Sequence, residues 1–174
     1  MMKTVASIRK WMDKIIMGAC IVLFGLMVIV GSYQIITRYF FNKPSTVSEE
    51  LLTFSFVWMA LLASAYVFGI RDHMRMGFLA DKIQGKGRIV LDIVIEILIL
   101  VFALLTLVWG GSAIMQLSMQ QMTASLGVPM GYIYTILPVS GVAIVVYSIL
   151  NIIDMAHGKN LDMPSGVEEK GDVY

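Results

Sequence analysis

Residues 15–36 read IIMGACIVLFGLMVIVGSYQII, a stretch that contains no charged side chain. Crossing the hydrocarbon core of a bilayer takes about 20 apolar residues in a helix, because each residue rises about 1.5 Å. Three further stretches meet this requirement, at 51–70, 89–109 and 133–153. Each must be helical, because lipid offers no hydrogen-bond partner to an unpaired backbone. The sequence therefore predicts an all-α integral membrane protein with four transmembrane helices.

The composition agrees with a chain that lies mostly in lipid. Of 174 residues, 58% are hydrophobic and 14% are charged, which is too apolar for a water-soluble surface. We expect residues 1–158 to form a single four-helix membrane domain and the polar residues 159–174 to form a flexible cytoplasmic tail. Cys20 is the only cysteine, so no disulfide within the chain can hold the fold. Residues 15–36 are long for a signal peptide and lack a small-x-small cleavage pattern, so we expect them to remain as the first helix.

The positions of lysine and arginine predict the orientation. Eleven of the thirteen lie in the N-terminal segment, in the second connection or in the C-terminal segment. Only Arg38 and Lys43 lie on the other side, and the third connection has none. Because cytoplasmic segments carry the excess of positive charge, we expect both termini in the cytoplasm.

The connections carry signals for helix ends and for short additional helices. Residues 46–49, Thr-Val-Ser-Glu, have the pattern of a capping box that opens the second helix, which makes the first two helices an antiparallel hairpin. The N-terminal segment and the connection at 71–88 mix apolar with basic residues, so we expect short interfacial helices there.

The end of the third helix is open to two interpretations. No charge occurs from Ile97 to Ile153, so the helix could run through the glycine pair at 110–111 until Gly127 and Pro129 break it. It would then be about 35 residues long and would project from the bilayer or tilt strongly. Alternatively, the chain breaks at the glycine pair and a separate periplasmic helix follows.

Charged residues flank the first connection. Arg38 ends the first helix, and Glu49 and Glu50 begin the second, so an ion pair across the hairpin is geometrically natural. The alternative is that the glutamates complement the positive end of the helix dipole while Arg38 extends to the surface. The two arrangements can coexist.

Arg88, Asp92 and Glu96 are spaced four residues apart and project from one face of the third helix. Arg88 can pair with Asp92 at the cytoplasmic boundary, whereas Glu96 lies about 12 Å deeper than Arg88 by helix rise. A carboxyl group at that depth needs a partner or a proton. A proton or ion relay is one hypothesis. We favour a packing contact with another helix or subunit, because a lone carboxylate provides no continuous path.

Two pairs of small residues lie on the second helix at a spacing of four. They are Ala60 with Ser64 and Ala65 with Gly69. Such pairs let helix backbones approach closely. The neighbour is either another helix of this chain or a partner.

No sequence pattern supports catalysis. We find no glycine-rich phosphate loop, no nucleophile with a base and no metal-ligand cluster. His73 and His157 fall at or beyond the cytoplasmic ends of helices, so haem ligation is not expected. We therefore expect no enzymatic activity and no cofactor or metal in this chain. The net charge of +1 gives no indication of nucleic acid binding.

Several short motifs follow one another along the chain. They are RYFFN at 38–42, SEEL at 48–51, Trp58, HMRM at 73–76 and LGVP at 126–129. With these motifs the chain resembles the small membrane subunit of tripartite ATP-independent periplasmic (TRAP) transporters, over about residues 15–153. It departs from that pattern at Val47, where the family often has tryptophan, and at Gly77, where it often has an acidic residue.

The resemblance implies a three-protein secondary transporter of the bacterial inner membrane. In it a soluble periplasmic protein captures an organic acid, such as a dicarboxylate or a sialic-acid-like compound. A large polytopic membrane subunit moves the acid with sodium, and its sites hold both. The small subunit would then be a scaffold that contacts the large subunit and membrane lipids, with periplasmic loops that help to dock the binding protein. The residues expected at structural or subunit contacts are Arg38, Glu49, Glu50, Trp58, His73, Arg75, Arg88, Asp92 and Glu96.

Two other classes of protein remain open. A self-assembling small exporter or channel would use Glu96 as its coupling carboxylate. A membrane anchor of a redox complex would carry haem or quinone.

Overall fold

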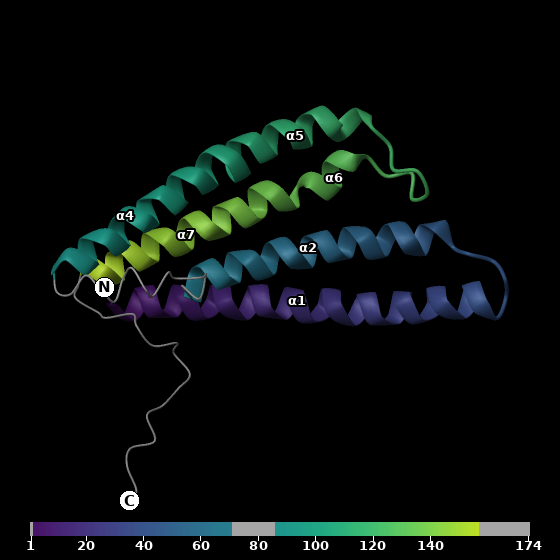
Figure 1. Ribbon diagram of the computed structural model, residues 1–174, viewed down its shortest axis with the longest axis horizontal. Helices are drawn as coiled ribbons and strands as arrows, with labels where there is room; N and C mark the ends of the chain where they lie inside the picture. The colour runs from purple at the N-terminus through teal and green to yellow at the C-terminus, as the bar shows by residue number, and fades with distance from the viewer. Residues whose placement is uncertain (1, 71–85, 157–174) are drawn as a thin grey trace, which may run out of the picture.

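The computed structural model describes residues 2–70 and 86–156. In this part of the chain, four helices are long and apolar enough to cross a membrane, which confirms the predicted fold class (Figure 1). The first two form an antiparallel hairpin of α1 (Met2–Tyr39) and α2 (Thr46–Ile70). The fourth consists of the short α6 (Met130–Tyr134) and the long α7 (Ile136–Ala156).

The third spanning segment, here called helix 3, continues without a break from Lys86 to Gln120. It consists of α4 (Lys86–Phe102), the π-helix η1 (Ala103–Gly110), α5 (Gly111–Leu117) and the 3-10 turn η2 (Ser118–Gln120). The long-helix interpretation is therefore confirmed, although the helix ends at Gln120 and not at Gly127.

Gly111 of helix 3 and Gly141 of α7 permit close packing, and the glycine pair at 110–111 does not end helix 3. A Cβ atom at Gly111 would lie 2.8 Å from Cβ of Leu137, and one at Gly141 would lie 2.7 Å from Cβ of Leu107. Real Cβ atoms do not approach so closely, so the two glycines let helix 3 and α7 meet backbone against backbone.

The start of α2 differs from the prediction by one residue. Ser45, not Thr46, precedes the helix and caps it. The hydroxyl oxygen of Ser45 accepts hydrogen bonds from the backbone N–H of Ser48 at 3.3 Å and from its hydroxyl group at 2.9 Å. Glu49 lies in the first turn of α2, where its negative charge complements the helix dipole.

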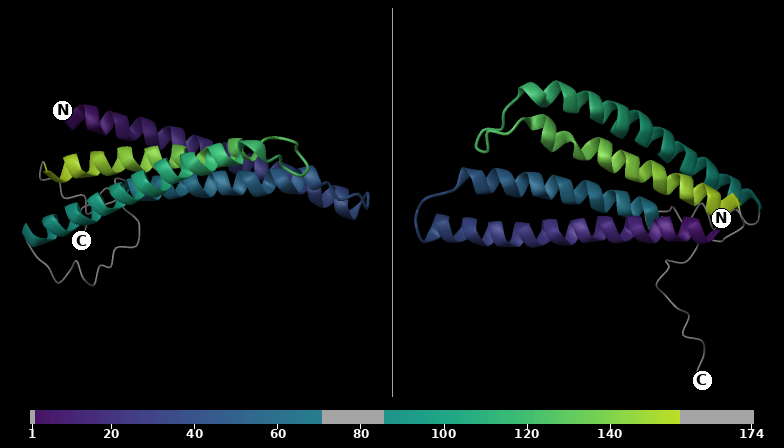
Figure 2. Two further views of the ribbon diagram at one scale, coloured as in Figure 1. Left: turned by 90° about the horizontal axis from the view of Figure 1, so that it is seen from above. Right: turned by 180° about the vertical axis from the view of Figure 1, so that it is seen from behind.

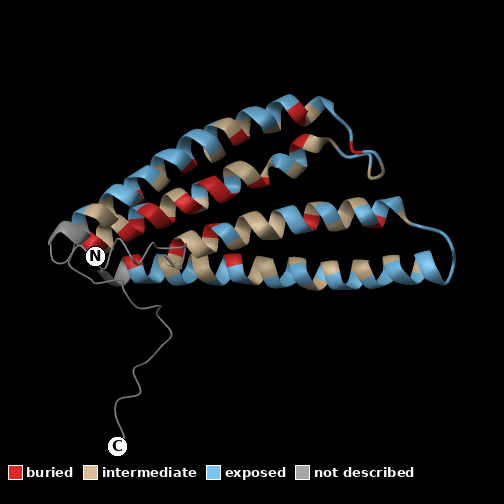
Figure 3. Cartoon of the chain, in the orientation of Figure 1, coloured by how far each residue is buried: buried red, intermediate tan, exposed pale blue. Residues whose placement is uncertain are grey.

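The spanning helices lie side by side as a row that twists along its length (Figures 1 and 2). The main interfaces join α1 to α2, α2 to α7, and α7 to α4 and η1. The buried Ala65, Ala103 and Ile144 form a core where α2, η1 and α7 meet. Figure 3 shows buried residues concentrated on α7, whereas α1 and helix 3 are largely exposed.

The row has a terminal end, where α1 begins and α7 ends, and a loop end, which holds residues 40–45 and 121–129 (Figure 1). The interfacial helix predicted for the N-terminal segment is not separate, because α1 continues straight from Met2 into the apolar stretch. The helix predicted within 71–88 falls mainly on residues that lie outside the described part of the chain, as does the predicted tail at 159–174.

Candidate functional site

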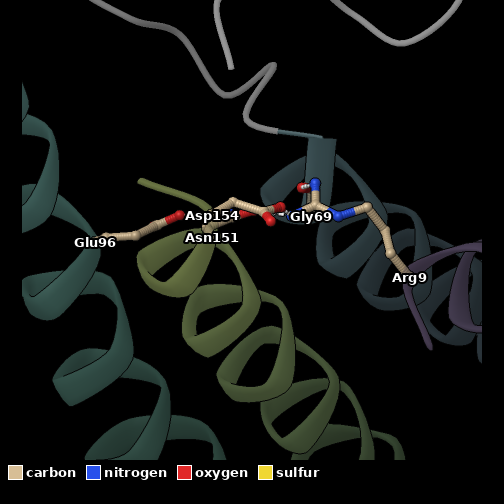
Figure 4. Close-up of polar contacts among 5 residues, drawn as sticks. All are labelled: Arg9, Gly69, Glu96, Asn151 and Asp154. Carbon is tan, nitrogen blue, oxygen red and sulfur yellow. Dashed lines mark hydrogen bonds and ion pairs between the residues drawn. The ribbon is translucent and has the colours of Figure 1, made fainter. Parts of the chain in front are cut away.

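At the terminal end, Arg9 joins three helices. One guanidinium nitrogen (Nη2) donates to Oδ1 of Asn151 at 2.6 Å and lies 3.1 Å from Oδ2 of Asp154, both on α7. The other (Nη1) donates to the carbonyl oxygen of Gly69 at 3.3 Å (Figure 4). That carbonyl belongs to the last turn of α2, where backbone oxygens lack donors within the helix. Arg9 therefore caps α2 and pairs with α7 at once.

Asn151 extends this contact to a fourth helix. Its side chain is fully buried, and its Nδ2 donates to Oε1 of Glu96 on α4 at 2.5 Å (Figure 4). The amide orientation follows from its neighbours, because a guanidinium can only donate and must face the amide oxygen. The amide nitrogen is then left to face the carboxyl group of Glu96. Through Asn151, α1 is linked to α4 across α7.

Tyr147 adds a second contact between α7 and the first hairpin. Its hydroxyl group donates to Oδ1 of Asp13 on α1 at 2.6 Å. Its ring covers Gly69, where an added Cβ would lie 2.7 Å from ring carbons. The Ala65–Gly69 pair thus serves a close approach within this chain, as one of the two interpretations held. We call the following set the terminal cluster: Arg9, Asp13, Gly69, Glu96, Tyr147, Asn151 and Asp154.

At the loop end, a single carboxylate holds a loop. Glu50 on α2 accepts hydrogen bonds from three consecutive backbone N–H groups, those of Ala124 at 3.1 Å, Ser125 at 2.9 Å and Leu126 at 2.8 Å. The loop is closed by its own bonds as well, since the N–H of Thr123 donates to the carbonyl oxygen of Val128 at 2.9 Å. We call the contact between Glu50 and residues 124–126 the loop clasp.

Between the two ends, Trp58 ties α2 to α6. Its indole N–H donates to the carbonyl oxygen of Ile133 at 3.0 Å. Ile133 lies in the last turn of α6, which ends at Tyr134 shortly before Pro138 of α7. Carbonyl groups at such an end need a donor from elsewhere, and Trp58 supplies one.

The ion pair predicted across the first hairpin is not formed in the described part of the chain. Arg38 and Glu49 are exposed, and both carboxylate oxygens of Glu50 are engaged by the loop clasp. The partner of Glu50 is a backbone segment 74 to 76 residues further along the chain, not the facing arginine.

The remaining predicted site residues lie on α4 or outside the described part of the chain. Glu96 is 4% exposed and has its partner on α7, while Asp92 is half-buried one turn earlier on α4. Arg88 belongs to the first turns of α4, and its side chain lies outside the described part of the structure. His73 and Arg75 also lie outside the described residues.

Sequence reasoning missed the centre of the terminal cluster. It used Arg9 only to set the orientation and gave no role to Asn151 or Asp154. A signal was present, because Asn151 is an amide inside the last apolar stretch and a polar group there needs a partner.

The chemistry of the terminal cluster is that of a structural joint. It combines one guanidinium with carboxyl, amide and hydroxyl groups that satisfy one another, and each bond joins different helices. Among residues 2–70 and 86–156, no group of three or more His, Cys, Asp or Glu side chains could hold a metal ion. The arrangement fixes helices relative to one another.

Comparison with known proteins relates most of the chain to transporter components. The profile of the family described as "Tripartite ATP-independent periplasmic transporters, DctQ component" matches residues 27–158. The chain is 30% identical over 138 residues to the sialic acid TRAP transporter small permease protein SiaQ of Vibrio cholerae, covering 79% of each protein. It is 24% identical over 138 residues to a protein of Haemophilus influenzae named as a TRAP transporter small permease protein, covering 79% of this chain and 85% of that relative.

Proposed function

Since this chain belongs to the DctQ family, the small membrane component of TRAP transporters, we propose that it acts as a scaffold for the large transport subunit. It is a multi-pass protein of the inner membrane. In this proposal the small subunit anchors and enlarges the large one within the bilayer, and it carries no transport site of its own.

The observation that carries the proposal is the set of cross-helix ties along the row. The terminal cluster joins α1, α2, α4 and α7 at one end, and the loop clasp joins α2 to residues 124–126 at the other. Trp58 adds a tie between them. A scaffold needs this kind of internal rigidity, because its partner must move against a fixed surface.

The outer surface of the row also fits a protein that works within an assembly. Large apolar side chains are exposed along α1 and helix 3, including Ile29 at 72%, Leu98 at 63% and Trp109 at 73% (Figure 3). Within a bilayer, such surface is available both to lipid and to the apolar helices of another subunit.

We extend the proposal to substrate and coupling ion. The transported substrate is an organic acid, a dicarboxylate or a sialic-acid-like compound, and the large subunit carries it with sodium. The relative from Vibrio cholerae, which is named for sialic acid, supports this class of substrate. No described residue of this chain is assigned to substrate or sodium.

We further propose that the loop end helps to dock the periplasmic binding protein. The loop clasp attaches residues 124–126 to α2, and Met122 and Val128 on either side of them are 65% and 39% exposed. Lys43 lies exposed in the other loop at the same end. A fixed loop with apolar and charged side chains provides a preorganised contact surface.

Reconstitution tests the proposal directly. The chain, the large subunit and the binding protein are placed in liposomes under a sodium gradient, and uptake of labelled sialic acid and of a dicarboxylate is measured. We expect the two membrane subunits to co-purify and uptake to require all three proteins. Uptake by this chain alone, or its purification as a homo-oligomer without a large subunit, would contradict the scaffold.

The substitution Glu96→Gln separates the scaffold from the exporter hypothesis. A glutamine keeps an oxygen that can accept from Asn151, so the terminal cluster and uptake by the full transporter are expected to persist. An exporter that couples transport to the Glu96 carboxyl group would lose activity completely. The variant Glu49→Gln, at an exposed position, serves as the control.

A further inference from the structure

The helix α1 forms one edge of the row and is exposed over much of its length (Figures 1 and 3). Its exposed residues include an apolar stripe. The members of the stripe are spaced four or seven residues apart and therefore share one face. They are Trp11, Ile15, Val22, Ile29 and Ile36 of α1 with Phe40 directly after its end, and they are 48–81% exposed. The half-buried positions of α1 lie on another face, where a Cβ atom at Gly31 would lie 3.9 Å from Cδ2 of Leu52 on α2.

At the terminal end, the stripe ends at Trp11, which has a lysine on each side of it in the sequence. Trp11 is 70% exposed, and the exposed Lys10 and Lys14 lie on either side of it in the sequence. Neither lysine has an ion pair or hydrogen bond with the rest of the described chain. Tryptophan beside lysine is the combination that occupies the headgroup layer of a bilayer.

At the loop end, the same combination occurs again. Tyr39, Phe40 and Phe41 are 73%, 81% and 67% exposed, with the exposed Arg38 before them and Lys43 after them. Within the described residues, neither cation has an acceptor.

The separation of the two ends matches a bilayer. Trp11 and Tyr39 are 28 residues apart in one continuous helix, which corresponds to about 42 Å of helix rise. A bilayer with its headgroups is about 40–45 Å thick. Helix 3, at the other edge of the row, carries Lys86 and Arg88 in its first turn but has no cation at its loop end, because no lysine or arginine occurs from Ile89 to Gly158.

We propose that the outer face of α1 is the lipid-facing edge of the subunit, with cations at both ends that bind the phosphodiester groups of anionic lipids. The large subunit then occupies other surfaces of the row. This inference deepens the proposed scaffold function. It rests on that function for one point, namely that the protein partner is the large subunit. The match between stripe length, cation placement and bilayer thickness favours lipid over a protein partner here.

Photo-crosslinking in the complex tests the assignment. A benzophenone amino acid replaces Ile29, which is 72% exposed on α1, and in a second variant replaces Leu105, which is 58% exposed on helix 3. Both complexes are placed in nanodiscs that contain phosphatidylglycerol. We expect lipid adducts and no cross-link to the large subunit from position 29. A cross-link from that position to the large subunit or to a second copy of this chain would overturn the inference. The Leu105 variant is the control that shows how efficiently the benzophenone cross-links at the other edge of the row.

Lipid retention gives a second, independent measurement. The pairs Lys10→Gln with Lys14→Gln and Arg38→Gln with Lys43→Gln remove two cations each. We expect either pair to weaken phosphatidylglycerol binding about tenfold or more, measured by native mass spectrometry. Unchanged retention in both double variants would refute the headgroup sites. If the large subunit failed to co-purify while lipid adducts still formed at position 29, the scaffold proposal would fail and the lipid-facing assignment would stand.

Discussion

The two ends of the row are held by different kinds of contact. At the terminal end, side chains from α1, α4 and α7 bond mainly to one another, so each bond depends on two residue identities. At the loop end, one carboxylate bonds to three backbone N–H groups. The side chains of residues 124–126 are not used in these bonds, so the loop clasp depends on Glu50 and on the backbone conformation alone. A cluster of paired side chains should therefore tolerate substitution less well than the loop clasp.

The strongest test of this comparison is Arg9→Met. The variant leaves Asp154 without its cation, Asn151 without its donor and the Gly69 carbonyl without its cap. Removing one partner of a largely buried ion pair costs about 3–5 kcal/mol. We expect the lower part of that range, because the Arg9 and Asp154 side chains are 20% and 12% exposed. Unfolding in a denaturing detergent titration measures it.

The exposed neighbour Lys10 provides the matched control for that variant. Lys10→Met changes the same number of charges but no bond within the described part of the chain. A similar loss of stability in both variants would mean that Arg9 acts through net charge and not through the terminal cluster.

Glu50→Ala tests the loop end and is expected to have a smaller effect. Hydrogen bonds to a charged acceptor contribute about 1.5–3 kcal/mol, and water can replace part of this contribution at a partly exposed loop, so we expect about 2 kcal/mol. Hydrogen exchange at the amides of residues 124–126 should accelerate, while the terminal cluster stays protected. Glu49→Ala, one residue earlier and exposed, should leave these amides unchanged.

Gly69→Ala should give the smallest change. The added methyl group would lie 2.7 Å from the Tyr147 ring, which must shift away from α2. Overpacking of this kind costs about 1–3 kcal/mol, and alanine recovers about 1 kcal/mol of helix propensity, so the net loss is about 1 kcal/mol. Gly18→Ala meets no atom within 4 Å and should be neutral or stabilising. If Gly18→Ala also lost stability, the loss in Gly69→Ala could not be attributed to contact with the Tyr147 ring.

The spans were predictable because lipid imposes a length and a composition on any helix that crosses it. The contacts that join the spans depend on tertiary geometry, which is harder to predict from the sequence. Glu50 illustrates this, since its partners are backbone groups that have no sequence signature. From the sequence alone, the facing Arg38 is therefore the natural partner.

Arg9 was hidden for a different reason. In the sequence it is one of several basic residues before an apolar stretch, which is the usual signal for orientation. Only the continuation of α1 beyond the apolar stretch brings Arg9 beside Asn151. The glycine pair at 110–111 was similarly ambiguous, because glycine both ends helices and permits close packing.

The π-helix η1 has a consequence for the rotational phase of helix 3. Its hydrogen-bonded rings include one residue more than those of an α-helix, as the bond from the N–H of Gly111 to the carbonyl oxygen of Thr106 shows. Side chains beyond Gly110 therefore point in directions that a helical wheel drawn from α4 does not give. Helix 3 contacts α7 on both sides of η1, with Glu96 facing Asn151 before it and Gly111 against Leu137 after it. One helix thereby presents two differently aligned faces to the same neighbour.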